Sequence, residues 1–172
     1  MINIVLFNPE IPNNTGNIIR TCLATGSKLH IIKPIAFDLH PKWMKRAAAG
    51  RLLSDIEHEV HDSYEKFIEK YGDKKIHYIT RYGQNTYAES DFKYETNDGE
   101  VWVMFGKEST GIPKEILQKD LSRCLRIPMV AKERSLNLAT TVMLLAYEIH
   151  RQNGFKGLSE FEVQKGKDFI KE

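Results

Sequence analysis

The order of apolar runs at the amino terminus restricts the fold more than any other feature of this sequence. Residues 2–7 form a run of β-branched and other apolar side chains, which is typical of a buried strand. A helix should follow, with Asn14 or Thr15 as its N-cap and Gly26 just after its end. Residues 29–32 then form a second short apolar run. Strand, helix and strand in this order predict an α/β fold with a mostly parallel sheet flanked by helices.

Later segments extend this α/β pattern. Ser63 should cap a helix over residues 64–71, and a longer helix should begin with Ser135 as its N-cap and end before Gly154. Further strands are expected at residues 56–60, 76–80, 101–105 and 125–129.

Length and composition are those of an ordinary soluble globular protein. The chain has 172 residues, of which 41% are hydrophobic and 28% charged, so it can bury a real core in one domain. We place that domain at residues 1–157 and treat residues 158–172 as an amphipathic C-terminal tail. The net charge of +2 neither requires nor rules out a nucleic acid partner. No apolar run could span a bilayer and no signal peptide precedes the first strand, so we expect a cytoplasmic protein without a membrane partner.

The sequence gives little support for a metal site. Cys22 and Cys124 lack the spacing of a zinc motif and lie in apolar segments, so we expect buried thiols. His58 and His61 lie close together but have no third ligand nearby in the sequence. We therefore expect no metal.

The loop after residues 101–105 combines small and polar residues. Its sequence over 106–111 is Gly-Lys-Glu-Ser-Thr-Gly, which differs from a phosphate P-loop and lacks the three-glycine spacing of a dinucleotide fingerprint. Two interpretations stay open, a ligand-binding loop and a plain strand-to-helix turn. Glu108 taken alone is more often an exposed loop acid than a catalytic one.

Two further junctions follow within a few residues. The strand over 125–129 should stop at Pro128, which cannot donate a hydrogen bond to a sheet. A loop then leads to Ser135 and Asn137, whose side chains suit helix capping with or without a ligand. The next helix has four consecutive apolar residues, 142–145, which cover most of its circumference. A helix that is apolar all round must be covered on all sides, and we expect a second subunit to supply part of that cover.

Two basic features concern nucleic acid. Residues 41–51 should form a short basic helix, which places Trp43 among the basic side chains of Lys42, Lys45 and Arg46. Interleaved cations and an aromatic ring suit an RNA backbone with a stacked base, and the alternative is a solvated helix face with Trp43 packed inward. Arg20 points off the apolar face of the first helix, and its spacing alone predicts a surface arginine.

Three segments taken together resemble the three motifs of the SPOUT RNA methyltransferases. The first is residues 3–20, with Pro-Glu-Ile-Pro-Asn-Asn-Thr-Gly-Asn at 9–17. The second is residues 105–113, Phe-Gly-Lys-Glu-Ser-Thr-Gly-Ile-Pro. The third is residues 125–138, which begins Leu-Arg-Ile-Pro-Met and ends Arg-Ser-Leu-Asn-Leu. The chain is most similar to the small single-domain members, which methylate the ribose of the wobble nucleotide of tRNA.

The resemblance implies a fold, a reaction and partners. The fold is an α/β domain with a deep trefoil knot near the carboxyl end, a rare exception to unknotted chains. The reaction transfers a methyl group from S-adenosylmethionine to the ribose 2′-hydroxyl of a wobble cytidine or uridine. The implied partners are tRNA, bound at its anticodon region, and a second copy of the chain packed through the C-terminal helix.

The resemblance also implies roles for individual residues. Arg20 would orient the hydroxyl and the neighbouring phosphate, Glu108 would brace the site or the positive donor, and Asn137 would fix the loop and the substrate. Tyr147 is implied as an RNA contact, with packing as its alternative role. The residues implied around the cofactor are Ile79, Thr80, Gly106, Ile127, Met129, Ser135 and Leu136, and the glycine at 106 would let the ligand approach closely.

The chain departs from the family pattern in two places that concern the RNA surface. Thr110 stands where the family loop more often has a basic residue, and residues 46–53 replace the usual Arg-Ala-Gly-Leu-Asp-Tyr by Arg-Ala-Ala-Ala-Gly-Arg-Leu-Leu. Two rival functions stay open: methylation of another tRNA or ribosomal RNA position, and RNA binding without catalysis. A Rossmann-type oxidoreductase would need glycines where Asn8-Pro9-Glu10 follows the first strand.

Overall fold

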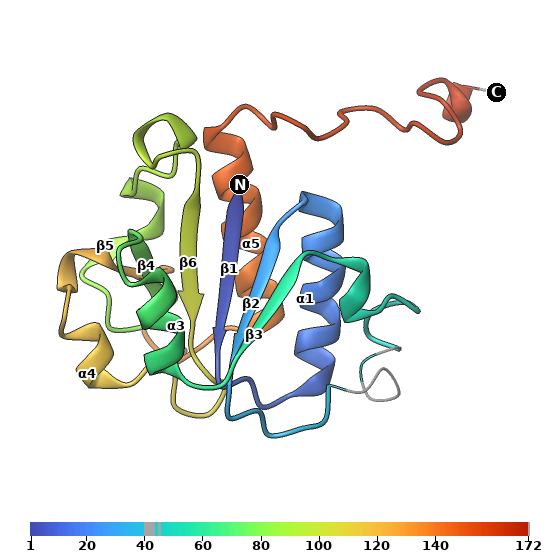
Figure 1. Ribbon diagram of the computed structural model, residues 1–172. Coiled ribbons are helices and arrows are strands. Elements are labelled where there is room, and N and C mark those ends of the chain that lie inside the picture. The colour runs from blue at the N-terminus through green and yellow to red at the C-terminus, as the bar shows by residue number, and fades with distance from the viewer. Residues whose placement is uncertain (40–43, 45, 172) are drawn as a thin grey trace.

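A seven-stranded sheet forms the centre of the molecule (Figure 1). The computed structural model describes residues 1–39, 44 and 46–171. All strand pairs are parallel, in the order β3-β2-β1-β6-β4-β7-β5, which confirms the predicted α/β sheet. The strands are β1 (Ile2–Phe7), β2 (Lys28–Ile32), β3 (His58–His61), β4 (Ile76–Ile79), β5 (Asn85–Thr86), β6 (Val101–Phe105) and β7 (Cys124–Arg126). The trefoil knot stays a prediction.

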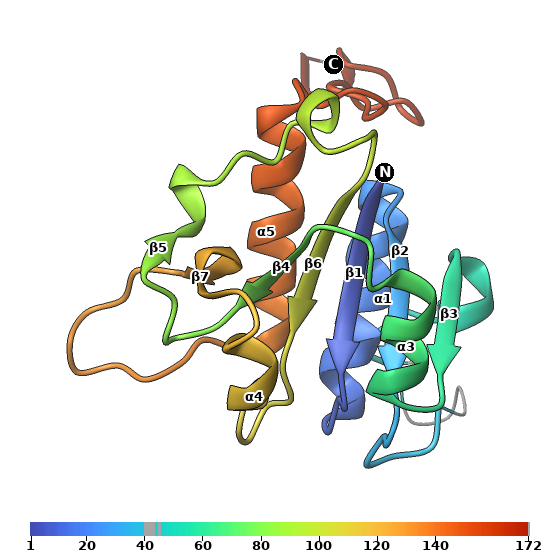
Figure 2. The ribbon, with the colours of Figure 1, turned by 60° about the vertical axis from the view of Figure 1, so that its left-hand side comes forward.

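Helices cover both faces of the sheet (Figures 1 and 2). α1 (Pro12–Thr25) and α5 (Leu138–Gln152) pack against each other on one face, and α3 (Tyr64–Tyr71) and the short α4 (Lys114–Leu117) lie on the other. Because side chains alternate along a strand, each face of β1 supplies a separate core. The remaining turns are 3₁₀ helices: η1 (Leu53–Asp55), η2 (Tyr87–Glu89), η3 (Tyr94–Thr96), η4 (Leu121–Arg123) and η5 (Phe169–Lys171).

The strands predicted at residues 2–7 and 101–105 are confirmed with the same bounds. β3 begins at His58, two positions later than the alternating pattern over residues 56–60 predicts. β7 ends at Arg126 instead of continuing to residue 129. Its neighbour β4 ends at Ile79 and β5 has only 2 residues, so no described strand lies alongside the chain beyond Arg126.

Both long helices begin at other residues than predicted. α1 begins at Pro12, so Asn14 and Thr15 lie inside its first turn, where both are buried. The cap of α5 is Asn137 and not Ser135: the Asn137 side chain accepts hydrogen bonds from the backbone N–H groups of residues 139 and 140. Three other caps are confirmed: Ser63 accepts from the N–H of residue 66, and Gly26 and Gly154 adopt left-handed conformations after the ends of α1 and α5.

Within one chain α5 is buried on one side only. Val142, Leu145 and Ile149 are at most 1% exposed. Met143 and Tyr147, on the other side, are 49% and 43% exposed. The described part of the chain therefore leaves the outer face of this apolar helix uncovered.

Two segments at the edge of the fold correspond to the predicted RNA surface and to the predicted C-terminal tail. Of the helix predicted at residues 41–51, Lys42, Trp43 and Lys45 lie outside the described residues, and residues 46–50 form turns instead of a regular helix. Arg46 is exposed. Beyond α5 the chain extends away from the body (Figure 1), and its large apolar side chains are exposed. In the part of the chain that the structure describes, no helix is both long and apolar enough to cross a membrane.

Candidate active site

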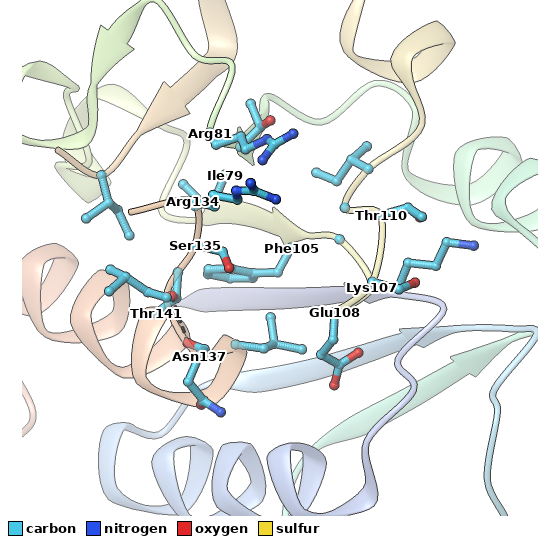
Figure 3. Close-up of a pocket in the computed structure, with 18 of the residues that line it drawn as sticks. Ile79, Arg81, Phe105, Lys107, Glu108, Thr110, Arg134, Ser135, Asn137 and Thr141 are labelled. Atoms are coloured by element: carbon cyan, nitrogen blue, oxygen red, sulfur yellow. Dashed lines mark hydrogen bonds between the residues drawn. The ribbon is translucent and has the colours of Figure 1, made fainter. Parts of the chain in front are cut away.

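A cavity of about 840 Å³ lies where the carboxyl ends of β1, β4, β6 and β7 meet (Figure 3). Because the strands are parallel, the loops that follow them gather at one edge of the sheet, where open α/β sheets bind ligands. Residues 79–82 come from the loop after β4, residues 105–112 from the end of β6 and its loop, and residues 127–141 from the segment after β7. The start of α1 adds Ile11 and Asn14.

The structure brings most of the predicted site residues together at this cavity. All seven residues implied around the cofactor line it: Ile79, Thr80, Gly106, Ile127, Met129, Ser135 and Leu136. Glu108 and Asn137 also line it. Arg20 does not; it lies exposed on α1, further along the helix than Asn14. Tyr147 lies on the outer face of α5 and also outside the cavity.

The loop over residues 106–111 is closed by its own backbone. The N–H of Gly111 donates to the carbonyl oxygen of Lys107 at 2.8 Å, and Gly111 has a φ of 75°. A Cβ on Gly106 would lie 2.2 Å from the carbonyl carbon of Gly111 and from the nitrogen of Ile112. Glycine is therefore required at 106 by the fold of this loop. The close approach of a ligand at Gly106 stays a prediction.

The carboxylate of Glu108, in the loop after β6, caps the start of α1. It accepts hydrogen bonds from the backbone N–H groups of Glu10 and Ile11 at 2.9 and 3.2 Å, and from Asn14 Nδ2 at 3.0 Å. Ile11, the N-cap residue of α1, has an apolar side chain that cannot accept a hydrogen bond. A carboxylate at this end of a helix also interacts favourably with the helix dipole. The bracing role implied for Glu108 thus has a concrete form: it joins the β6 loop to α1.

A second carboxylate ties the same two loops together. Glu10 accepts hydrogen bonds from both the N–H and the Oγ of Ser109, each at 2.8 Å. These bonds favour the charged form, so they lower the pKa of the Glu10 carboxyl group. Two carboxylates therefore join the loops after β1 and β6. Glu108 of the β6 loop binds the start of α1, and Glu10 of the β1 loop binds Ser109.

Asn14 and Asn137 extend this network to α5. Asn137 Nδ2 donates to Asn14 Oδ1 at 2.9 Å, while Asn137 Oδ1 caps α5. Asn14 in turn donates to Glu108. A continuous set of hydrogen bonds thus fixes three loops along one side of the cavity, which gives a bound ligand a rigid frame.

One group of titratable side chains elsewhere has the composition of a metal site. Ligand atoms of His30, Glu59 and His61 lie within 4.8 Å of one another, on the face of the sheet covered by α3. Glu59, however, already accepts hydrogen bonds from Lys70 Nζ at 2.5 Å and from the Tyr71 hydroxyl at 2.7 Å. Two cations, Lys28 and Lys70, lie beside this carboxylate. The arrangement is that of a hydrogen-bonded structural cluster, because a metal ion would have to displace Lys70.

Comparison with known proteins identifies the family. The model of the SpoU rRNA Methylase family matches residues 1–147. The chain belongs to the SpoU rRNA methylase family. A tRNA (cytidine(34)-2′-O)-methyltransferase of Yersinia pestis is 42% identical to this SpoU methylase over 164 residues, which cover 91% of this chain and 97% of that protein.

Solved structures agree with the family and the fold. One, from a study of the 2-OH methylation of C/U34 on tRNA, has a TM-score of 0.78 and 37% identity, and the match covers 88% of this chain and 90% of that one. The SpoU methyltransferase AviRb of Streptomyces viridochromogenes, solved with AdoMet, has a TM-score of 0.72 and 22% identity over 90% of this chain and 58% of that one. At that identity the second likeness shows the fold alone.

The cavity of this SpoU methylase also contains residues that sequence reasoning missed. Thr141 lies on the first turn of α5, and four others add charge or an aromatic ring: Arg81, Tyr82, Lys107 and Arg134. Their positions in the sequence could have indicated them, because Arg81 and Tyr82 directly follow Thr80 and Arg134 directly precedes Ser135. Apolar side chains also line the wall, among them Phe105, Ile112 and Leu138.

Proposed function

We propose that this SpoU methylase transfers a methyl group from S-adenosylmethionine to the ribose 2′-hydroxyl of the wobble cytidine or uridine of tRNA. One observation supports this most strongly: the loops after β4, β6 and β7 place all seven residues implied around the cofactor on one cavity. The relatives that match over nearly the whole chain are named for this reaction.

The chemistry of the cavity fits S-adenosylmethionine. Ile79, Ile127, Met129 and Leu136 offer apolar side chains to the adenine, and backbone groups of the same loops are available to hydrogen bond its edge. Glu108, Asn14 and Asn137 would hold the loops in place. When bound, the cofactor supplies an electrophilic methyl group on a sulfonium. The chain must orient the ribose hydroxyl toward it and help that hydroxyl to lose a proton.

We propose that Arg20 reaches this centre from a second copy of the chain, because it does not line the cavity of its own chain. It lies six residues after Asn14, which is about 9 Å along the helix axis at about 1.5 Å per residue. It is exposed and forms no ion pair with the described residues of its own chain. We therefore propose a homodimer packed through the exposed face of α5, in which Arg20 of one copy serves the cavity of the other.

In this proposal the surface of the dimer recognises the tRNA. We propose that Lys42, Lys45, Arg46 and Tyr147 contact the anticodon region of tRNA. Exposure of Arg46 and Tyr147 supports this, while Lys42 and Lys45 lie outside the described residues.

The decisive experiment is nucleoside mass spectrometry of tRNA from cells that lack the protein, paired with transfer assays on the purified chain. We expect the 2′-O-methyl group at the wobble position to disappear in the deletion and to return when the wild-type protein is supplied. Loss of methylation at another tRNA or ribosomal RNA position would reassign the substrate. RNA binding without affinity for S-adenosylmethionine in calorimetry would mean a non-catalytic module.

Mixing of variants tests the shared centre. Arg20→Ala alone should lose methyl transfer while its affinity for S-adenosylhomocysteine stays within about threefold, because Arg20 lies outside the cavity. A Gly106→Val variant should fail to bind the cofactor, because its loop cannot close. Co-expressed chains carrying one change each should regain activity in mixed dimers, which contain one intact centre. Absence of that rescue, with mixed dimers present, would contradict a centre built from two copies.

A further inference from the structure

Two arginine side chains from different loops extend into the same part of the cavity (Figure 3). Arg81 follows β4, and Arg134 lies in the segment between β7 and α5. Both are exposed, and neither forms an ion pair with a carboxylate among the described residues. Lys107 also lines the cavity but points away from them (Figure 3). Two like charges that share an opening repel each other unless an anion lies between them.

The Arg81 loop is held in place before any ligand arrives. Its guanidinium lies over the ring of Tyr82, 4.7 Å from the ring centroid. Arg126 of β7 donates a hydrogen bond to the carbonyl oxygen of Arg81. Gly83 packs on the same strand so closely that a Cβ there would lie 2.5 Å from the carbonyl carbon of Leu125. A guanidinium that is already oriented loses little side-chain entropy on binding, which favours tight contact with an oxyanion.

The protein wall does not supply this anion, and the methyl donor brings no net negative charge. Glu108, the carboxylate on the wall, is occupied by three hydrogen bonds to the start of α1. The donor carries a positive sulfonium and a positive ammonium against one carboxylate, so its binding adds net positive charge beside the two arginines. RNA is the partner in the proposed reaction that brings negative charge, one for each phosphate.

We infer that Arg81 and Arg134 together hold an RNA backbone phosphate next to the ribose that is methylated. The inference rests on the proposed function and extends it to the position of the substrate in the cavity. Arginine suits the role because its planar fork matches the oxygen atoms of a phosphate. Tyr82 acts as a positioning residue, since its ring fixes the direction of the Arg81 guanidinium.

Salt-dependent tRNA binding tests this assignment. The affinity of purified protein for wobble-unmethylated tRNA is measured at several salt concentrations, with S-adenosylhomocysteine present, for wild type, Arg81→Gln, Arg134→Gln and the double variant. Each single change should weaken binding about tenfold near physiological salt and reduce the slope of log K against log salt by about one. Lys66→Gln on α3 removes the same charge at a distance from the cavity and is the matched control, with a slope expected to equal that of wild type.

Further measurements separate this idea from its alternatives. Calorimetry should show an affinity for S-adenosylhomocysteine within about threefold of wild type in both single variants. A large loss of that affinity with an unchanged salt slope would place the guanidiniums on the donor's carboxylate and overturn the inference. Unchanged slopes in variants of an enzyme that still methylates tRNA would overturn the phosphate contact alone. Failure of the wild-type protein to bind or methylate any tRNA would overturn the proposed function together with it.

Discussion

At the scale of single residues, the Glu108 carboxylate accepts three hydrogen bonds from the start of α1. We predict that Glu108→Ala lowers the free energy of unfolding by about 1–3 kcal/mol, because two backbone N–H groups at the start of α1 lose their acceptor. Glu108→Gln should lose less, since its amide oxygen can still accept. Urea unfolding measures these differences, with exposed Glu115→Ala on α4 as the control. Methyl transfer abolished by Glu108→Ala at unchanged stability would point to a catalytic acid instead.

A buried histidine pair makes stability depend on pH. His30 Nδ1 lies 3.1 Å from His61 Nε2, and His30 Nε2 lies 3.2 Å from Asn3 Oδ1. Burial lowers the pKa of His30 to about 3 and also lowers the pKa of His61. Unfolded histidines take up protons below about pH 6.5, whereas the folded pair resists protonation. The unfolded state therefore binds more protons as the pH falls, and the free energy of unfolding should decrease from about pH 6.5 toward pH 3.

Thermal unfolding between about pH 8 and pH 4 checks this prediction. The melting temperature of wild type should fall steadily below about pH 6.5. His30→Gln should weaken that dependence, because it removes the side chain with the strongly lowered pKa. His58→Gln, on an exposed residue of β3, should leave the dependence as it is in wild type. Identical profiles for His30→Gln and wild type would show that other groups control the acid sensitivity.

At the scale of elements, the sequence predicted the interior of strands better than the first residues of helices. The runs at residues 2–7 and 101–105 are visible locally, because buried parallel strands are apolar on both faces. The start of α1 depends on Glu108, which lies 97 residues from Ile11 in the sequence. No local pattern around Asn14 contains that partner, so the predicted cap was wrong.

The candidate site shows the same limit. The motifs predicted which loops line the cavity, because each loop follows a strand that ends at the same edge. They did not predict that Arg81 and Arg134 share an opening, because the loops meet only when β4 and β7 become neighbours in the sheet. Gly106 lines the cavity and also packs against the backbone of residues 111 and 112, a contact that the motif did not predict.

Asn137 couples two helices, and its substitutions should separate capping from coupling. Asn137→Ala removes the α5 cap and the bond to Asn14, and should destabilise the fold by about 1–2 kcal/mol. Asn137→Asp keeps an acceptor for the α5 N–H groups but cannot donate to Asn14. We expect it to have nearly wild-type stability in urea and a weaker affinity for S-adenosylhomocysteine. Ser135→Ala is the matched control, and a larger destabilisation there than at Asn137 would restore the cap first predicted.

At the scale of the whole molecule, the outer face of α5 is the surface through which we propose that the chain forms a dimer. Arg20 lies outside the cavity of its own chain, and the exposed apolar side chains of α5 need cover. A homodimer through α5 would cover these apolar side chains and would bring Arg20 of one copy to the cavity of the other. A helix expected to be apolar all round would make Leu145 a suitable residue for testing the dimer. The structure separates the two sides of the helix: Leu145 is 1% exposed and belongs to the core.

Charge placed on the two sides of α5 should therefore have different effects. Met143→Glu combined with Tyr147→Glu should give a folded monomer in sedimentation analysis, with near-native circular dichroism and little methyl transfer, because both changed residues are exposed in the single chain. Leu145→Glu should instead destabilise the chain by about 3–5 kcal/mol, since it buries an unpaired charge in the core. If the Met143 and Tyr147 double variant sediments as a monomer and keeps full activity, each chain must complete its own centre, and Arg20 would then not act from a second copy.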